Sequence, residues 1–184
     1  MAMRYFAGMR KFLAAGGTAI FFALAPGSVA GLIPFWLTGW RIRRPQLLPP
    51  RASLPLRVAG AILLVTGAVV LVQAFVRFVV EGIGTPAPVA PTERLVVGGL
   101  YRYVRNPMYV AVVAAILGQA LLLGQPVLLL WAAAAGAAMV AFVHGYEEPA
   151  LAQRFGAQYD AYRRAVPAWW PRRHPWQPGG SDQS

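Results

Sequence analysis

The chain has 184 residues, of which 58% are hydrophobic and only 12% are charged, and its mean hydropathy is +0.51. A soluble domain carries about 25% charged residues, so this composition excludes an ordinary solvated surface and indicates a single-domain membrane protein. The net charge of +11 lies in short basic segments beside apolar stretches, which is typical of membrane topology signals rather than of nucleic-acid binding, and the absence of cysteine excludes disulfides and thiolate chemistry.

The first apolar stretch, residues 12–40, contains 29 residues without a charge after a basic N-terminus. A signal peptide has the same pattern, and residues 23–25 resemble a cleavage site, but Pro26 and the continuing apolar stretch argue against cleavage. We therefore predict a transmembrane helix over about residues 12–38, tilted or kinked at Pro26 and Gly27. A re-entrant hairpin that folds back at these two residues is the alternative.

A basic, proline-broken connection, residues 41–55, precedes a second predicted span over about residues 56–80. Gly60, Gly67 and Ala68 on this span would permit the close approach of another helix. The next connection, residues 81–107, begins with glycines and prolines that are unsuited to a helix.

Residues 106–146 contain no formal charge over 41 positions, which is enough for two spans. Gly124, Gln125 and Pro126 near the middle predict a helical hairpin, with helices over about 107–123 and 126–146. Small residues at 132–138 favour close packing of the second helix. Because both ends of a hairpin emerge at the same membrane face, we expect residues 101–109 to lie beside Glu147 and Glu148.

Residues 98–109 combine two arginines, three tyrosines and an Asn–Pro step. Arginine and tyrosine also gather at the membrane surface simply as anchors. Anchoring does not require the paired acids that the hairpin brings to the same face. We therefore predict that the two segments form one binding pocket.

Residues 150–162 carry apolar and aromatic side chains at helical spacing with charged residues between them, and so predict an amphipathic helix on the membrane surface. Trp169 and Trp170 follow as an expected aromatic anchor. The predicted fold class is all-α: a polytopic helical membrane protein with about four transmembrane helices, a C-terminal helical hairpin and an interfacial amphipathic helix.

The distribution of positive charge bears on the orientation of these spans. With four spans, eleven arginine and lysine residues lie on the side of both termini and the 81–107 connection, and five arginines lie in the 41–55 connection or just after it at Arg57. The larger number favours a cytoplasmic location for the first side. The five arginines on the opposite side argue against this orientation.

Short elements within residues 82–172 resemble the isoprenylcysteine carboxyl methyltransferase and phospholipid methyltransferase superfamily in order and spacing. These elements are Leu95, Val96, Val97, Gly99, Tyr101, Asn106, Pro107 and Tyr109, then Glu147, Glu148, Leu151, Phe155, Gly156, Tyr159, Tyr162, Val166 and Pro167. The resemblance implies a small membrane enzyme that binds S-adenosylmethionine (SAM) at the cytosolic face and methylates a lipophilic substrate. It also implies a methyltransferase core, placed at residues 82–176. The apolar stretches before it predict N-terminal transmembrane helices within residues 1–81, and a disordered tail is expected over 177–184.

The resemblance also implies which residues form the site. The expected cofactor-binding residues are Arg94, Leu95, Val96, Tyr101, Asn106, Pro107, Tyr109 and Glu147. Arg105 and Glu148 are the predicted catalytic residues, and no metal ligand is expected. SAM offers an ammonium group to a carboxylate, a carboxylate to an arginine, and an adenine and a sulfonium to tyrosine faces. His144, the one obvious titratable base nearby, is expected to be structural.

Three departures from the family pattern bear on the substrate. Asn106 replaces a frequent histidine, Ala111 replaces a glycine, and Val143 replaces an arginine associated with substrate. The last change weakens the case for a prenylcysteine carboxylate, although an isoprenylcysteine-like or other small lipophilic acceptor is still the first prediction. A phospholipid amine is the alternative acceptor.

A non-enzymatic membrane scaffold or transporter subunit is the alternative from another class. It would need a polar path through spans that hold little besides Thr66, Gln73 and Gln119. The expected partners are the lipid bilayer and a lipophilic substrate, without nucleic acid. The methyl acceptor and the oligomeric state cannot be read from the sequence.

Overall fold

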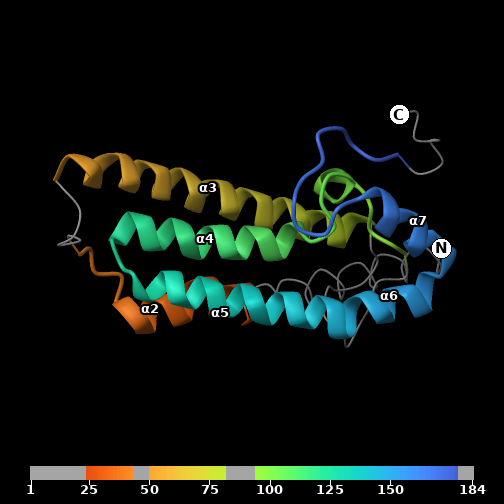
Figure 1. Cartoon of the computed structure of the whole chain (residues 1–184), viewed down its shortest axis with the longest axis horizontal. Coiled ribbons are helices and arrows are strands. Elements are labelled where there is room, and N and C mark those ends of the chain that lie inside the picture. The colour runs from red at the N-terminus through yellow and green to blue at the C-terminus, as the bar shows by residue number, and fades with distance from the viewer. Residues whose placement is uncertain (1–23, 44–49, 82–93, 178–184) are drawn as a thin grey trace, which may run out of the picture. The chain divides into compact units, whose positions relative to one another are not determined.

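A computed structural model describes residues 24–43, 50–81 and 94–177, and these residues are helical except for their connections (Figure 1). No strand occurs in these three ranges, so the all-α prediction is confirmed. The elements are η1 (Ser28–Leu32), α2 (Ile33–Thr38), α3 (Pro50–Glu81), η2 (Gly99–Arg102), α4 (Pro107–Leu123), α5 (Val127–Phe142), η3 (Val143–Glu147), α6 (Glu148–Phe155) and α7 (Ala157–Ala165).

The chain divides into two compact units. The helical unit contains the described residues of 21–72 and 108–141, and the terminal unit contains those of 73–107 and 142–184. The boundaries fall within continuous helices, so α3, α4 and α5 contribute residues to both units.

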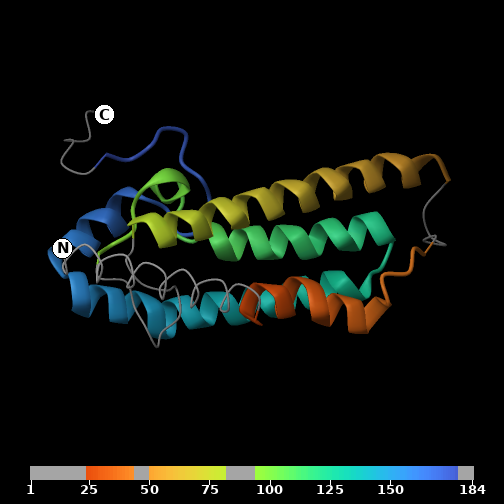
Figure 2. The same cartoon turned by 180° about the vertical axis from the view of Figure 1, so that it is seen from behind.

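Glycines in the helical unit bring the backbones of α3 and α4 into contact. A Cβ atom at Gly60 would lie 2.6 Å from the backbone nitrogen of Leu122, and one at Gly118 would lie 2.6 Å from that of Leu64. At Gly67 the nearest atom would be a backbone oxygen of α4 at 2.9 Å. Figure 1 and Figure 2 both show the two helices side by side. The predicted close approach at Gly60 and Gly67 is therefore confirmed.

The described part of the first apolar stretch is one helix, Leu24–Thr38, with a π-helical turn at Ser28–Leu32. The backbone at Gly27 has ordinary helical angles of φ −64° and ψ −38°. The chain therefore does not fold back at Pro26 and Gly27, and the re-entrant alternative is wrong at that point. Residues 12–23 of the predicted span lie outside the described residues.

Side chains from the hairpin hold this first helix through its backbone. Gln119 Nε2 donates to the carbonyl of Ala30 at 2.6 Å, and Trp131 Nε1 donates to that of Val29 at 2.9 Å. Pro34 lacks an N–H and cannot donate to either carbonyl four or five residues earlier. The hairpin side chains thus satisfy acceptors that the helix itself leaves open.

Two described helices, Ser53–Arg77 and Val127–Phe155, are long and apolar enough to cross a membrane. Only 28% and 22% of their most apolar windows are buried inside the protein, so most of this apolar surface faces outward. Leu24–Thr38 and Pro107–Leu123 are shorter apolar helices. The total of four spans stays a prediction.

Helix boundaries match the predicted hairpin and differ at the second span. Pro107 is the first residue of α4, and α5 begins at Val127 after the turn. Helix α3 begins at Pro50 and includes Pro55, where a helix start near residue 56 was expected. Pro55 lies close to the helix start, where the loss of one backbone hydrogen bond leaves the rest of the helix intact.

The predicted amphipathic helix is two helices in the structure. Gly156 separates α6 from α7 with φ +49° and ψ −128°, a conformation that residues with a Cβ rarely adopt. The expectation of one continuous helix is therefore wrong. The apolar side chains of both helices pack within the terminal unit, around a cluster made of Tyr159, Tyr162 and Val166. How these helices lie relative to the bilayer stays a prediction.

The C-terminal segment, residues 166–177, pairs with the loop at 102–106 through backbone hydrogen bonds. Arg105 N–H donates to the carbonyl of Pro167 at 2.9 Å, and Arg172 N–H donates to that of Tyr103 at 2.9 Å. Trp170 is 81% exposed, as an aromatic anchor would be. The backbone hydrogen bonds of this segment therefore help to fix the conformation of the loop that precedes α4.

Candidate functional site

A buried ion pair lies at the centre of the terminal unit. Arg105 Nη1 lies 2.7 Å from Glu148 Oε1, and the two side chains are 11% and 6% exposed. Both charges are largely removed from water, and such a pair is stable only where further hydrogen bonds satisfy each member. The pair joins the loop before α4 to the start of α6, so the predicted proximity of these two segments is observed for Arg105 and Glu148.

The surrounding backbone fixes the guanidinium of Arg105. Its Nε donates to the carbonyl of Val166 at 2.9 Å, and its Nη1 also donates to the hydroxyl of Tyr159 at 3.1 Å. The backbone N–H of Arg105 also donates to the carbonyl of Pro167. Three groups therefore hold the positive charge itself, and a fourth holds the backbone of the same residue.

Glu148 follows the π-helical turn η3, in which its own N–H donates to the carbonyl of Val143. A π turn inserts one extra residue into a helix and is often found at functional sites. The two adjacent acids at this turn differ in burial: Glu148 is 5% exposed, whereas Glu147 is half-buried. The two adjacent carboxylates therefore have different environments.

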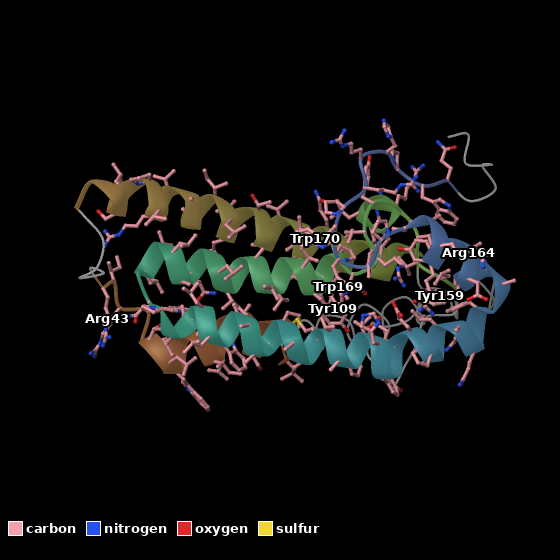
Figure 3. The ribbon with its side chains drawn as sticks, in the orientation of Figure 1. Arg43, Tyr109, Tyr159, Arg164, Trp169 and Trp170 are labelled. Atoms are coloured by element: carbon pink, nitrogen blue, oxygen red, sulfur yellow. The ribbon has the colours of Figure 1, made fainter. Side chains whose placement is uncertain are left out.

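Three further side chains complete the surroundings of Glu148. His144 Nδ1 lies 3.3 Å from Glu148 Oε2, and Arg163 Nη2 lies 3.6 Å from the same oxygen. The rings of His144 and Trp169 meet edge to face with centroids 6.4 Å apart. Figure 3 marks Trp169 and Tyr159 on the segments that contribute to this site. We call the group formed by Arg105, His144, Glu148, Tyr159 and Arg163 the Glu148 cluster.

This environment raises the pKa values of two buried tyrosines of α7. Burial raises the pKa of Tyr159, and the nearby Glu148 carboxylate raises it further against the opposing effect of Arg105. Burial likewise holds the pKa of Tyr162 well above its usual range. The hydroxyl of Tyr162 donates to the carbonyl of Tyr101 at 2.7 Å. Both tyrosines therefore stay neutral in the folded protein and support the loop as hydrogen-bonding groups.

The predicted cofactor-binding residues before η2 lie in a short non-helical segment, Arg94–Val96. Arg94 is exposed, Leu95 is half-buried against the Tyr159 cluster, and Val96 is 6% exposed. Within the described part of the chain, the backbone groups of Leu95, Val96 and Val97 pair with no other backbone group. Such groups need a partner when they are shielded from water, which suits a segment that binds a ligand through its backbone.

The other predicted cofactor residues surround the start of α4. Tyr101 is 6% exposed, and Asn106 is 9% exposed and donates to the carbonyl of Ala168 at 3.2 Å. Pro107 is buried at the first position of α4. Glu147 lies in the terminal unit with them. Tyr109 belongs to the helical unit, so its proximity to the others stays a prediction.

His144, Tyr159, Arg163 and Trp169 were not among the predicted site residues. His144 and Glu148 are four residues apart on a helix, as are Tyr159 and Arg163, so helical spacing signals each pair. The spacing does not reveal that both pairs meet. That follows from the break at Gly156, which sets the position of α7 after α6.

These features define a helical protein with long outward-facing apolar helices and a buried ion pair between a tyrosine-rich loop and a paired-acid helix. A family model described as phospholipid methyltransferase matches residues 56–158. The chain belongs to the phospholipid methyltransferase family, part of the superfamily that the sequence resembles, and the protein is thus a membrane methyltransferase. Comparison with curated proteins and with solved structures gives no significant match.

Proposed function

We propose that the protein transfers a methyl group from SAM to a lipophilic acceptor drawn from the bilayer. One observation carries this proposal: the 2.7 Å ion pair between Arg105 and Glu148. It joins two segments that both lie within the match to the methyltransferase family. A scaffold or transporter subunit would not need a buried acid and arginine at this point, and the family membership argues against that class.

The residues of the terminal unit fit the chemistry of SAM. SAM, when bound, supplies a methyl group made electrophilic by a sulfonium. The exposed guanidinium of Arg94 can hold a carboxylate, and the half-buried Glu147 can accept hydrogen bonds from an ammonium or from ribose hydroxyls. The backbone of Leu95–Val97 offers donors and acceptors, and tyrosine faces suit adenine and cationic groups.

The two acids have separate roles in this proposal. Both oxygens of Glu148 already face Arg105, His144 and Arg163, so we assign Glu148 to holding the site together. Glu147 is the acid assigned to the cofactor. Asn106 and Pro107 fix the entry to α4, and Tyr101 and Tyr109 complete the proposed cofactor-binding set with Leu95 and Val96.

The acceptor is proposed from two observations. Val143 is buried, 1% exposed, at the position where the prenylcysteine enzymes have an arginine associated with substrate. The family description names phospholipid methyltransferases. Both favour an amine head group over a prenylcysteine carboxylate. We further propose a multi-pass protein with a methyltransferase core at residues 82–176 and an active site that faces the cytoplasm.

Equilibrium binding of SAM to the purified protein tests the cofactor assignment. Glu147→Ala and Glu147→Gln should each weaken binding by about 10- to 150-fold, because a hydrogen bond to a charged group contributes about 1.5–3 kcal/mol. Asp160→Ala, which removes an exposed acid on α7, is the matched control and should leave affinity unchanged. Unchanged affinity in both Glu147 variants contradicts the site, whereas no binding by the wild type contradicts the function.

Methyl-labelled SAM identifies the acceptor class. Membranes that contain the protein are incubated with the label, which is then followed into lipid, protein and small-molecule fractions. Label in an amine phospholipid supports the proposal. Label confined to base-labile methyl esters would assign a carboxylate acceptor instead.

A further inference from the structure

His144 is the member of the Glu148 cluster whose role the cofactor assignment leaves open. Its side chain is 52% exposed, while the carboxylate that it contacts is 6% exposed. One ring nitrogen therefore faces a buried acid, and much of the imidazole is open to whatever lies outside the cluster. This arrangement combines a fixed base with an accessible surface.

The contact with Glu148 determines which nitrogen can accept a proton. An ionised carboxylate can only accept hydrogen bonds, so Nδ1 of His144, 3.3 Å from Oε2, must carry a hydrogen. In the neutral imidazole the other nitrogen, Nε2, then holds the lone pair. Free histidine has no such constraint, so the carboxylate selects one tautomer and one ring orientation.

The rest of the cluster holds the Glu148 carboxylate in place. Arg105 Nη1 holds Oε1 at 2.7 Å, and Arg163 Nη2 approaches Oε2 at 3.6 Å. Tyr159 bonds to Arg105 and stays neutral. Because two arginines face the carboxylate, it does not depend on a charged His144 for compensation.

Trp169 lies against the imidazole of His144. Its ring meets that of His144 edge to face at 6.4 Å, and the adjacent Trp170 is 81% exposed. Indole faces attract ammonium cations, and exposed tryptophans lie at the depth of lipid head groups. The surroundings of His144 thus suit a cationic head group that must lose a proton before it can react.

We propose that His144 is the proton acceptor of the methyl-transfer reaction and that Arg105, Glu148 and Arg163 position it; this inference rests on the function proposed above. Nε2 takes a proton from an ammonium acceptor, R–NH3⁺, and leaves R–NH2 with a free electron pair. That pair forms the new N–CH3 bond while the C–S bond of the donor breaks and its electrons pass to sulfur. The imidazolium then releases its proton to water. A carboxylate acceptor would need no such step.

The tautomer of His144 can be measured without any activity. The chain has two histidines, so His174→Gln protein labelled with ¹⁵N-histidine gives the signals of His144 alone. We expect the neutral ring to carry its hydrogen on Nδ1, and Glu148→Gln to abolish this preference. A neutral ring with its hydrogen on Nε2 would overturn the proposal.

Kinetics test the proton transfer itself, with phosphatidylcholine vesicles that contain phosphatidylethanolamine as the acceptor. His144→Gln should lower kcat by about 100-fold or more, the usual contribution of a general base, and leave SAM affinity within about twofold. The wild-type rate should rise with pH as the base loses its proton, and this dependence should vanish in the variant. Added imidazole should restore part of the activity of His144→Ala.

The controls separate this inference from the proposed function. His174→Gln should behave as the wild type, since that side chain is exposed and lies outside the cluster. A His144→Gln protein that methylates the amine lipid at the wild-type rate over the whole pH range overturns the role of His144 alone. A wild type that binds SAM but labels only a lipophilic carboxylate also overturns it. A wild type that binds no SAM overturns the proposed function as well.

Discussion

The stability of a buried carboxylate such as Glu148 depends on its charged partners. The side chain is 6% exposed and faces Arg105, Arg163 and His144. Removing one partner from a buried ion pair leaves an uncompensated charge, which costs more than the pair itself contributes. The stability of the terminal unit therefore depends on whether the whole cluster is intact.

Arg105→Ala should lower the free energy of unfolding by about 3–5 kcal/mol, because it leaves Glu148 buried without its closest positive charge. Unfolding in detergent, followed by circular dichroism, measures the change. Arg164→Ala removes an exposed arginine of α7 (Figure 3) and should change stability by no more than about 0.5 kcal/mol. Equal effects of the two variants would contradict the structural role of the ion pair.

The buried tyrosines of α7 predict a loss of stability at high pH. Tyrosine in an unfolded chain ionises near pH 10, whereas Tyr159 and Tyr162 have raised pKa values in the fold. Their contribution is complete below about pH 10 and is lost as the pH rises further, because only the unfolded chain then releases the protons. Tyr162→Phe should make the free energy of unfolding fall less steeply above pH 10. Tyr146→Phe, at an exposed position, should leave the slope unchanged, and a wild-type slope in Tyr162→Phe would refute this account.

Glycine residues determine how closely the helices pack. The α3–α4 pair in the helical unit has backbone-to-backbone contact at Gly60 and Gly118. Close contact gives more van der Waals attraction, which must replace the hydrophobic effect as the force between helices in lipid. A single added methyl group would push the two backbones apart.

Gly118→Ala should lower the free energy of unfolding by about 1–3 kcal/mol, since its Cβ would lie 2.6 Å from the backbone nitrogen of Leu64. Gly136→Ala on α5 is the matched control, because its Cβ would meet only Val113 Cγ2 at 3.6 Å. There the change from glycine to alanine should be neutral or stabilising by up to about 1 kcal/mol. If Gly136→Ala proves the more harmful of the two, the inferred α3–α4 contact is wrong.

The distribution of charge sets an expectation for the molecule as a whole. Four spans would place Arg43 and Arg164 on opposite sides of the membrane, with the site on the cytoplasmic side. The chain has no cysteine, so a single introduced thiol reports the side on which it lies.

A membrane-impermeant maleimide should label Arg43→Cys in intact cells and Arg164→Cys only after permeabilisation. Both positions are exposed, so labelling does not depend on local unfolding. Labelling of both from one side would refute four spans. The reverse pattern would retain four spans and refute the orientation.

The sequence by itself determined the helical class, the hairpin and the family. Long uncharged stretches have few other ways to satisfy their backbone in a membrane, and the hairpin required residues near 105 to approach those near 148. These signals are local or depend on length alone, so no tertiary information is needed to recognise them.

Only the tertiary structure decided which side chains meet. Arg105 contacts Glu148 across 43 residues of sequence and Val166 across 61. Gly156 ends α6 through one backbone conformation, and the C-terminal segment pairs with the loop that precedes α4. Contacts over such separations depend on how the segments pack in three dimensions, and residue spacing does not encode that packing. The position of Trp169 beside His144, which completes the surroundings of the proposed proton acceptor, is a result of this kind.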